Sequence, residues 1–321
     1  MFWTITGLIL LLILGFAMLS KGSDWLVDGS ASIAKKLKIP QLIIGLTIVA
    51  MGTSAPEASV SISSVISGSS DISVGNIVGA NLFTVLVVLG VSACIRGLSV
   101  KKSTLIVDIP LVLLSNALLI LFGLDGSIVW YEGLIFFISF VAYIVFLILS
   151  AMKQRKKLGE SLEETPEEEI KEYSILKSII LTILGLGVVV GGSSVAVYSA
   201  KELARIIGLT ERIIALTVVS FGTALPEMFT SVKASIKGNV DIAVGNILGS
   251  NIFNLLFILG ITSIISPIAF STDFFIDVGV AVATMILLLA LIIRKKRLNR
   301  AGGIVALSTY AIYFVYLLLA I

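Results

Sequence analysis

The 321-residue chain has no histidine and a single cysteine, Cys94. Without histidine, zinc sites built from imidazole and acid–base catalysis by imidazole are excluded. One cysteine cannot form a disulfide within the chain. The sequence contains no GxxxxGK[S/T] segment, so the chain has no phosphate-binding loop of its own for ATP-driven transport. No Ser-Lys or GxSG-type nucleophile site stands out, which disfavours an intramembrane enzyme.

Charged residues are also scarce, at 13% of the chain, whereas 57% of the residues are hydrophobic and the mean hydropathy is +1.11. This composition predicts an all-α polytopic membrane protein with the lipid bilayer as its surroundings. The first apolar run, residues 2–19, has no basic leader and no small-residue cleavage site, so we expect it to be retained as a span. The net charge of +3 is confined to loops, and we expect no nucleic-acid partner.

Apolar segments of about 20 residues, the length that crosses a bilayer, occur ten times. The predicted spans are residues 3–20, with a tilted extension toward 33, 41–66, 73–95, 104–123, 128–151, 175–199, 211–236, 242–266, 275–293 and 302–320. We therefore predict a first five-span repeat (1–151), a charged linker (152–174) and a second five-span repeat (175–321). The acidic run in the linker is interpreted as a solvated tether, with a regulatory calcium site as the alternative.

The two halves of the chain are an internal duplication. Residues 71–83 read DISVGNIVGANLF, and residues 241–253 read DIAVGNILGSNIF. The same offset of 170 residues separates Glu57 from Glu227. Because each half has an odd number of predicted spans, the second half must enter the membrane from the opposite side, which is an inverted repeat typical of transporters.

Basic residues gather after the odd-numbered spans, at residues 35–38, 96–102, 153–157, 233–237 and 294–300. The positive-inside rule places these loops in the cytoplasm, so both termini are predicted outside the cytoplasm of a cell membrane. We expect Asp24 and Asp28, near the end of the first span, to lie at the membrane interface.

Two hydrophilic segments interrupt predicted spans: GTSAPE at residues 52–57 and GTALPE at residues 222–227. A carboxylate in hydrocarbon costs roughly 2.5–3.5 kcal/mol even on the lenient insertion scales, and this chain accepts that cost twice, at Glu57 and Glu227. Pro56 and Pro226 should free the backbone carbonyls four residues earlier. Carbonyl, hydroxyl and carboxylate oxygens are the ligands that Ca²⁺ and Na⁺ prefer.

The spans that follow each interruption bear a polar stripe at four-residue spacing. Its members are Asn76, Ala80 and Thr84 in the first half and Asn246, Ser250 and Asn254 in the second. Thr84 and Asn254 add oxygens to a site without adding charge. Two ionised glutamates carry a charge of −2, which one Ca²⁺, two Na⁺ or two protons would balance. Competition between these ions for one charge-neutral site would couple their fluxes, which predicts an exchanger. A cation channel is the alternative function from a different class.

The GTSAPE and GTALPE segments, each followed by GNIxGxN, resemble the two repeats of the calcium/cation antiporter superfamily. Over essentially the whole chain, the sequence is most similar to the prokaryotic sodium/calcium exchanger-like branch. The resemblance implies ten helices in two inverted repeats, with cation sites between spans two, three, seven and eight. It also implies alternating access by sliding of the first and sixth helices, with Ca²⁺ and Na⁺ as transported ions, no cofactor, and function as a monomer.

The resemblance also implies roles for particular residues. Glu57 and Glu227 correspond to central Ca²⁺ ligands, and Thr53 and Thr223 would contribute backbone carbonyls there. Na⁺ ligands are implied at the carbonyls of Ala50 and Ser220 and at the side chains of Ser54 and Ser250.

The sequence departs from the family pattern at four positions. Ala80 and Ala224 replace serines that are common in sodium-coupled relatives, and Thr84 and Asn254 stand where Asn and Asp often occur. Each flanking Na⁺ site therefore loses a donor, which keeps H⁺ or K⁺ as alternative coupling ions. The proton-coupled branch usually has a GNxxE-type motif, so Na⁺ stays the leading prediction.

Overall fold

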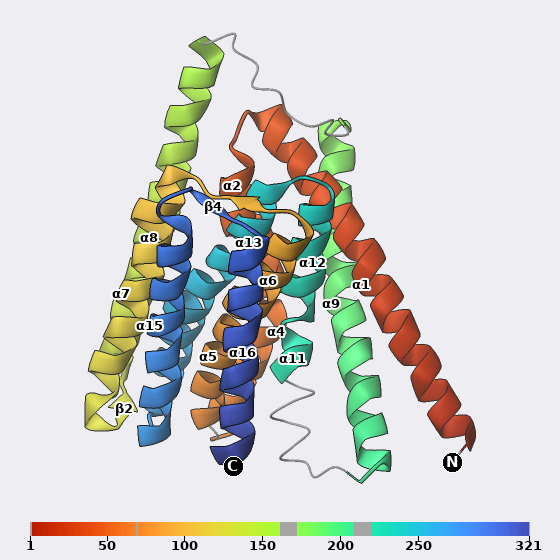
Figure 1. The fold of residues 1–321 in the computed structure, drawn as a ribbon, viewed down its shortest axis with the longest axis vertical. Coiled ribbons are helices and arrows are strands. Elements are labelled where there is room, and N and C mark those ends of the chain that lie inside the picture. Colours follow the sequence, from red (N-terminus) through yellow and green to blue (C-terminus); the bar gives the residue numbers. More distant parts are fainter. Residues whose placement is uncertain (1, 69, 161–171, 209–219, 321) are drawn as a thin grey trace.

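Helices make up nearly all of the described chain, and most of them run along the long axis of the molecule (Figure 1). The structure is a computed structural model that describes residues 2–68, 70–160, 172–208 and 220–320. The first half contains α1 (Phe2–Leu37), α2 (Gln41–Ile44), α3 (Ala50–Thr53), α4 (Ala55–Ile66), α5 (Asp71–Phe83), α6 (Leu89–Ile95), α7 (Ile109–Phe122) and α8 (Trp130–Glu160). The second half contains α9 (Ile175–Ile206), α11 (Ser220–Thr223), α12 (Leu225–Ile236), α13 (Val240–Ile252), α14 (Leu259–Ile265), α15 (Thr272–Ile292) and α16 (Arg300–Ala320).

Wider helical turns join several of these helices into longer spans. π-helical turns occur at η1 (Gly45–Val49), η2 (Thr84–Val88), η3 (Thr104–Asp108) and η6 (Phe253–Ile258), and a 3₁₀ turn at η4 (Gly123–Asp125). η2 and η6 follow α5 and α13, the helices that bear the polar stripes. Since π-helical turns are frequent at functional sites, their recurrence at both stripes singles out this region.

Eight helices within the described residues are long and apolar enough to cross a membrane, and a ninth span results if the bent pair Gln41–Thr53 and Ala55–Ile66 is counted as one. The chain is therefore an integral membrane protein. Of the ten predicted spans, the one at 211–236 lies partly outside the described residues, since the structure describes this region only from residue 220 onward.

Three helices extend beyond the predicted ends of their spans. α1 continues past the expected extension to Leu37, α8 continues to Glu160, within the segment predicted as a linker, and α9 continues to Ile206. Apolar content sets the predicted end of a span, but a helix continues for as long as its polar residues find partners. In α1 these partners come from α12, as described below.

Two short antiparallel strand pairs join the halves at opposite ends of the molecule (Figure 1). β1 (Leu98–Ser99) pairs with β4 (Arg297–Leu298), and β2 (Ser127–Ile128) pairs with β3 (Ile268–Ala269). Each pair takes one strand from each half of the chain, so the halves are connected above and below the candidate site.

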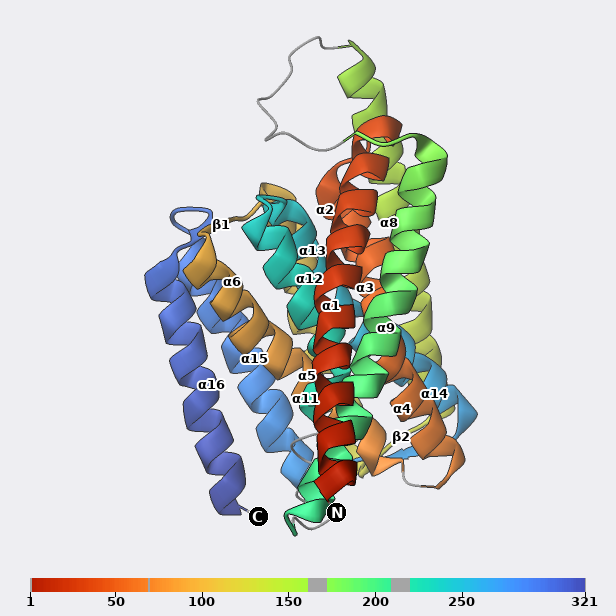
Figure 2. The same cartoon turned by 90° about the vertical axis from the view of Figure 1, so that its right-hand side faces the viewer.

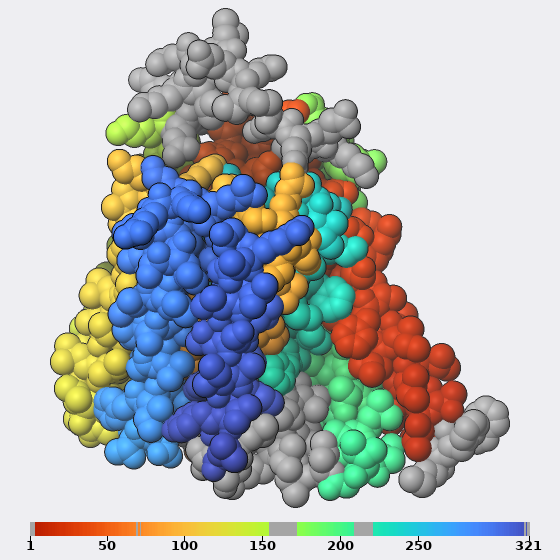
Figure 3. Space-filling model, viewed as in Figure 1, coloured from red at the N-terminus to blue at the C-terminus, as the bar shows by residue number. Residues whose placement is uncertain are grey.

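The main apolar core also draws on both halves, with Leu46, Leu86 and Leu256 among its buried side chains. No residue of α1 or α9 belongs to this core, within the part of the chain that the structure describes. α1 and α9 lie side by side along one flank of the molecule (Figures 1 and 2). The space-filling view shows α1 at the right-hand flank and α15 and α16 in front, to its left, with part of α12 visible between them (Figure 3).

Glycines allow α1 and α9 to approach each other closely. A Cβ atom on Gly22 would lie 2.9 Å from the carbonyl oxygen of Gly185, and one on Gly185 would lie 2.5 Å from the backbone nitrogen of Leu26. Gly15 and Gly192 make equally close approaches one heptad further along. These contacts join α1 and α9 into a tightly packed pair in which backbone touches backbone.

We expect Gly185→Ala to destabilise the protein, because its Cβ would clash with α1 backbone that cannot move aside alone. The cost should be about 1–3 kcal/mol, as for other overpacked sites. Gly187 is the matched control, since a Cβ there meets nothing within 4 Å. Thermal unfolding in detergent checks this: Gly185→Ala should lower the melting temperature and Gly187→Ala should not. Equal melting temperatures for the two variants would contradict the close packing.

Candidate functional site

Two helices are broken at matching points. α3 ends at Thr53 and α4 begins at Ala55, and the axis of this span bends by 47° at the break. In the second half, α11 ends at Thr223 and α12 begins at Leu225. A proline, Pro56 or Pro226, occupies the first turn after each break, where a missing N–H costs no helical hydrogen bond. The prolines therefore allow a new helix to begin in the middle of a span.

A carbonyl group near the second break is satisfied from outside its helix. The Gly222 carbonyl, which Pro226 was predicted to free, accepts a hydrogen bond from the Ser193 hydroxyl of α9 at 2.8 Å. The predicted Na⁺ ligand at the Ala50 carbonyl accepts two bonds, from the Ser54 amide at 3.0 Å and the Thr53 hydroxyl at 3.3 Å. The Ser220 backbone begins α11, and its side chain lies outside the described residues.

Each break is followed by a buried glutamate. Glu57 and Glu227 are each 1% exposed. The Ser54 hydroxyl, at the first break, donates to Glu227 Oε1 at 2.8 Å, while the Thr223 side chain, at the second break, hydrogen-bonds Glu57. The two carboxylates are close enough for their charges to repel each other. Each acid is thus held by the broken helix of the opposite half.

Two asparagines from the polar stripes support these acids in equivalent ways. Asn76 Nδ2 of α5 donates to the Glu57 carbonyl at 3.3 Å and to Ser61 Oγ at 3.1 Å. Asn246 Nδ2 of α13 makes the matching bonds in the second half, at 3.4 Å to the Glu227 carbonyl and 2.9 Å to Ser231 Oγ. Each stripe therefore contacts the helix that carries the glutamate of its own half.

Thr53 joins the two halves of this arrangement. Its hydroxyl donates to Asn246 Oδ1 at 3.0 Å, in addition to its bond within α3. The Ser250 hydroxyl, one turn beyond Asn246, donates to the Ile247 carbonyl at 2.9 Å and is fully buried. The hydroxyl oxygen of Ser250 keeps its lone pairs for a further partner.

A second polar layer, which sequence reasoning missed, joins α5 and α13 beyond the glutamates. Asn251 Nδ2 donates to Thr84 Oγ1 at 2.9 Å, and Asn254 Nδ2 donates to Asn81 Oδ1 at 3.0 Å. Asn81 also donates to the Asn251 carbonyl at 3.5 Å. Asn81 and Asn251 lie within the duplicated segments, so their 170-residue spacing could have identified them. They position Thr84 and Asn254, two of the predicted ligands.

Three acceptor oxygens in this region are buried and have no hydrogen-bond partner among the described residues: Glu57 Oε2, Glu227 Oε2 and Asn254 Oδ1. Buried acceptors without donors are costly, and a bound cation would satisfy them. Among the described residues no three Asp, Glu, His or Cys side chains form a group that could hold a metal. A cation here would therefore have two carboxylates, with its other ligands supplied by neutral oxygens. Such a set suits a hard cation that is easily released.

The site can be compared with known proteins. The family model described as sodium/calcium exchanger protein matches residues 7–149 and again residues 177–319. The sodium/calcium exchanger MaX1 of Methanosarcina acetivorans is 30% identical over 346 residues, covering 98% of this chain and 99% of that protein. The inner membrane protein YrbG of Escherichia coli is 32% identical over 273 residues, with 82% of this chain and 83% of that protein covered. A solved structure of the sodium-calcium exchanger NCX_Mj superposes with a TM-score of 0.84 at 29% identity, covering 97% of this chain and 99% of that chain.

We expect Asn81→Ala to weaken cation binding roughly 2- to 12-fold, because Asn254 loses the side chain that orients it. This range corresponds to the free energy of one hydrogen bond. Asn116→Ala is the control: Asn116 is also a buried asparagine, but its amide donates within its own helix, to the Val112 carbonyl at 2.8 Å. Calorimetric titration of both variants with Ca²⁺ and Na⁺ checks this. Equal losses of affinity in the two variants would show that the second polar layer has no special role.

Proposed function

The chain belongs to the sodium/calcium exchanger family, and we propose that it is a secondary antiporter that exchanges Ca²⁺ for Na⁺ across the membrane by alternating access. In this proposal, Ca²⁺ is bound between Glu57 and Glu227 near the middle of the bilayer. Transport is driven by the gradient of the counter-ion, and the protein uses no cofactor.

The observation that supports this most directly is the pair of buried glutamates with unpartnered oxygens. Glu57 and Glu227 come from opposite halves, and each is contacted by the broken helix of the other half. Ionised, the pair carries a charge of −2, which the membrane interior does not tolerate unpaired. Because one Ca²⁺ or two Na⁺ neutralise it equally well, the two ions compete for one site. If the site crosses the membrane only when it is neutral, the two fluxes are coupled.

The neighbouring oxygens have proposed roles as well. The Thr53 and Thr223 carbonyls would complete the Ca²⁺ site, while the Ala50 and Ser220 carbonyls with the Ser54 and Ser250 hydroxyls would bind Na⁺. Thr84 and Asn254 would supply oxygens without charge. Ser54 would have to exchange its bond to Glu227 for an ion, and the Ala50 carbonyl would have to accept an ion beside its two present donors.

We infer the membrane arrangement from the same duplication. Ten helices would form two inverted five-helix repeats, residues 1–151 and 175–321, joined by a cytoplasmic linker at 152–174. The described ends of the first and last helices lie at the same end of the molecule (Figure 1), as this arrangement requires. With the basic loops facing the cytoplasm, both termini lie outside the cytoplasm of the cell membrane. The site lies within one chain, so we propose that the monomer transports.

Exchange of Ca²⁺ for H⁺ is the second candidate, and one observation favours it. Ser54 donates a hydrogen bond to Glu227, but its equivalent in the second half is Ala224, which has no hydroxyl to offer Glu57 or a sodium ion. Fewer neutral ligands favour a proton, which needs only the carboxylate. K⁺ as the coupling ion is tested by the same experiment.

Uptake of ⁴⁵Ca²⁺ into proteoliposomes under separate Na⁺, K⁺ and pH gradients tests the proposal. We expect a Na⁺ gradient to drive uptake and uptake to stop without a counter-ion. Glu57→Gln and Glu227→Gln should each reduce Ca²⁺ affinity by roughly 10- to 100-fold and abolish uptake, since a charged ligand is lost. Glu132→Gln is the control, because Glu132 is also buried but accepts a hydrogen bond from the Val129 amide, at 2.9 Å.

Wild-type uptake in either site variant would remove the central proposal. Uptake driven only by a pH gradient would select the second candidate, and flux that continues without a counter-ion would indicate a channel.

Ser250→Ala should weaken the dependence of transport on Na⁺ more than the affinity for Ca²⁺. Its hydroxyl is a proposed Na⁺ ligand and makes no bond to either glutamate among the described residues. Initial rates measured at varied Na⁺ and at varied Ca²⁺ separate the two effects. A larger loss on the Ca²⁺ side would contradict the assignment of Ser250.

A further inference from the structure

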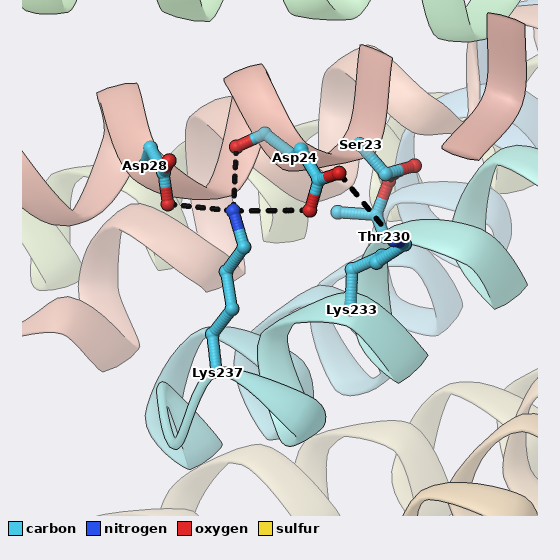
Figure 4. A network of polar contacts seen from close by, with 6 residues as sticks. All are labelled: Ser23, Asp24, Asp28, Thr230, Lys233 and Lys237. Carbon is cyan, nitrogen blue, oxygen red and sulfur yellow. Dashed lines mark hydrogen bonds and ion pairs between the residues drawn. The ribbon is translucent and has the colours of Figure 1, made fainter. Parts of the chain in front are cut away.

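Four charged side chains connect α1 to the end of α12 (Figure 4). The Lys237 ammonium lies 2.7 Å from Asp28 Oδ1 and 3.1 Å from Asp24 Oδ1, and it also donates to the Asp24 carbonyl at 3.1 Å. Lys233 lies 3.4 Å from Asp24 Oδ2. About a quarter of each lysine and of Asp24 is exposed. We call this group of two aspartates and two lysines the latch; its net charge is zero.

The latch connects two parts of the protein, the α1–α9 pair and the main core, that have few residues in common. α1 and α9 form the glycine-lined pair, and neither contributes to the main core. The pair contacts the core through two smaller apolar clusters, one around Leu26 and Val27 and one around Leu19. α12 bears Glu227, so Lys233 and Lys237 lie on the helix that forms half of the candidate site. The latch therefore joins the α1–α9 pair directly to the site-bearing helix.

Another ion pair of α1 does not reach the core. Lys35 pairs with Glu172, just before α9, at 2.7 Å, and its charge and hydrogen bond hold the pKa of Glu172 below its ordinary value. This contact stays on the side of the α1–α9 pair. Of the ion pairs described for α1, only those of the latch reach the core.

Among the described residues, the positions that the duplication relates to the latch carry no charge. The 170-residue offset relates Gly15 to Gly185 and Gly22 to Gly192, so it holds for α1 and α9 as well. By this offset the latch aspartates correspond to Ser194 and Tyr198, and the latch lysines correspond to Ser63 and Ser67. All four of these side chains are exposed and uncharged. Within the described part of the chain, the two halves therefore differ at these positions: charges join α1 to α12, and their equivalents on α9 and α4 are neutral.

We propose that the latch closes the ion pathway at the end of the molecule where Lys237 lies, and biases the resting transporter to open at the opposite end. This rests on the proposed function: for alternating access, we take the α1–α9 pair, which lies outside the main core, as the part that moves against it. The pathway can open at the latched end only when α1 separates from α12 there, and separation breaks all of these contacts together. Each partly exposed ion pair shifts such a two-state equilibrium by up to about fivefold.

A cysteine at Ser30 can report separation of α1 from the core. Ser30 shares a helix face with Val27, Ala31 and Ala34, which pack against the core, and it is fully buried. Its hydroxyl has no hydrogen-bond partner among the described residues, so exchange for cysteine removes no bond. Replacing Cys94, the sole native cysteine, with alanine leaves Ser30→Cys as the only reactive thiol.

The test compares rates of labelling by a hydrophilic maleimide in lipid nanodiscs. We expect Lys237→Met to raise the labelling rate about fivefold or more over the parent, because the central ammonium of the latch is lost. Lys101→Met is the matched control: it removes the Lys101–Asp241 ion pair, which lies at the same end but joins two parts of the core. The control should label at the parent rate. Asp28→Asn should reproduce the effect from the other helix, and Lys237→Arg should restore slow labelling.

An unchanged labelling rate in Lys237→Met and Asp28→Asn would contradict the proposed role of the latch. An equal rise of the labelling rate in Lys101→Met would contradict it as well. If Lys237→Met does not fold, Asp28→Asn alone decides the question. Labelling needs no ion gradient, so a protein that failed to take up Ca²⁺ would refute the proposed function and still report whether the latch holds α1.

Discussion

A pair of carboxylates buried among the helices of a membrane protein is the constraint on which the rest of this structure depends. An isolated charge there is too costly to persist, so the surrounding chain must offer hydrogen bonds and leave room for a neutralising ion. The broken helices meet the first need, since irregular backbone places Ser54 and Thr223 beside the acids. The oxygens without partners meet the second. A site that is fully satisfied by protein would have no use for an ion, and this one is satisfied only in part.

Much of the site could be predicted from the sequence, because the duplication repeats each polar motif at the same offset. One proline near one glutamate predicts little, but the pair of breaks at the same offset predicted Glu57 and Glu227 as partners, and the structure brings them together. The four-residue spacing placed Asn76 and Asn246 in polar stripes, and the structure brings both residues against the glutamate-bearing helices. The roles assigned to the Ala50 and Ser220 carbonyls and to Ser250 stay predictions.

Other features could not be predicted from the sequence, for physical reasons. Asn81 and Asn251 act across the interface between α5 and α13, so their role depends on how two helices cross rather than on spacing along either one. The apolar part of α1 was predicted at 3–20 with an extension toward 33, and the helix continues to Leu37, because hydropathy, which falls after Leu19, does not set the end of a helix. Asp24 and Asp28 were predicted at the membrane interface. Their pairing with Lys233 and Lys237 joins residues more than 200 positions apart, and only the fold brings these together.

The strand pairs and the shared core have a consequence for how such a protein could arise. β1 completes its pairing only with β4, β2 only with β3, and each glutamate finds its hydroxyl partner on the other half. A single half, synthesised alone, would expose unpaired strand edges and an uncompensated acid to lipid. A precursor with the length of one half would therefore need a second copy of itself to complete these contacts, and the duplicated chain supplies both copies at once.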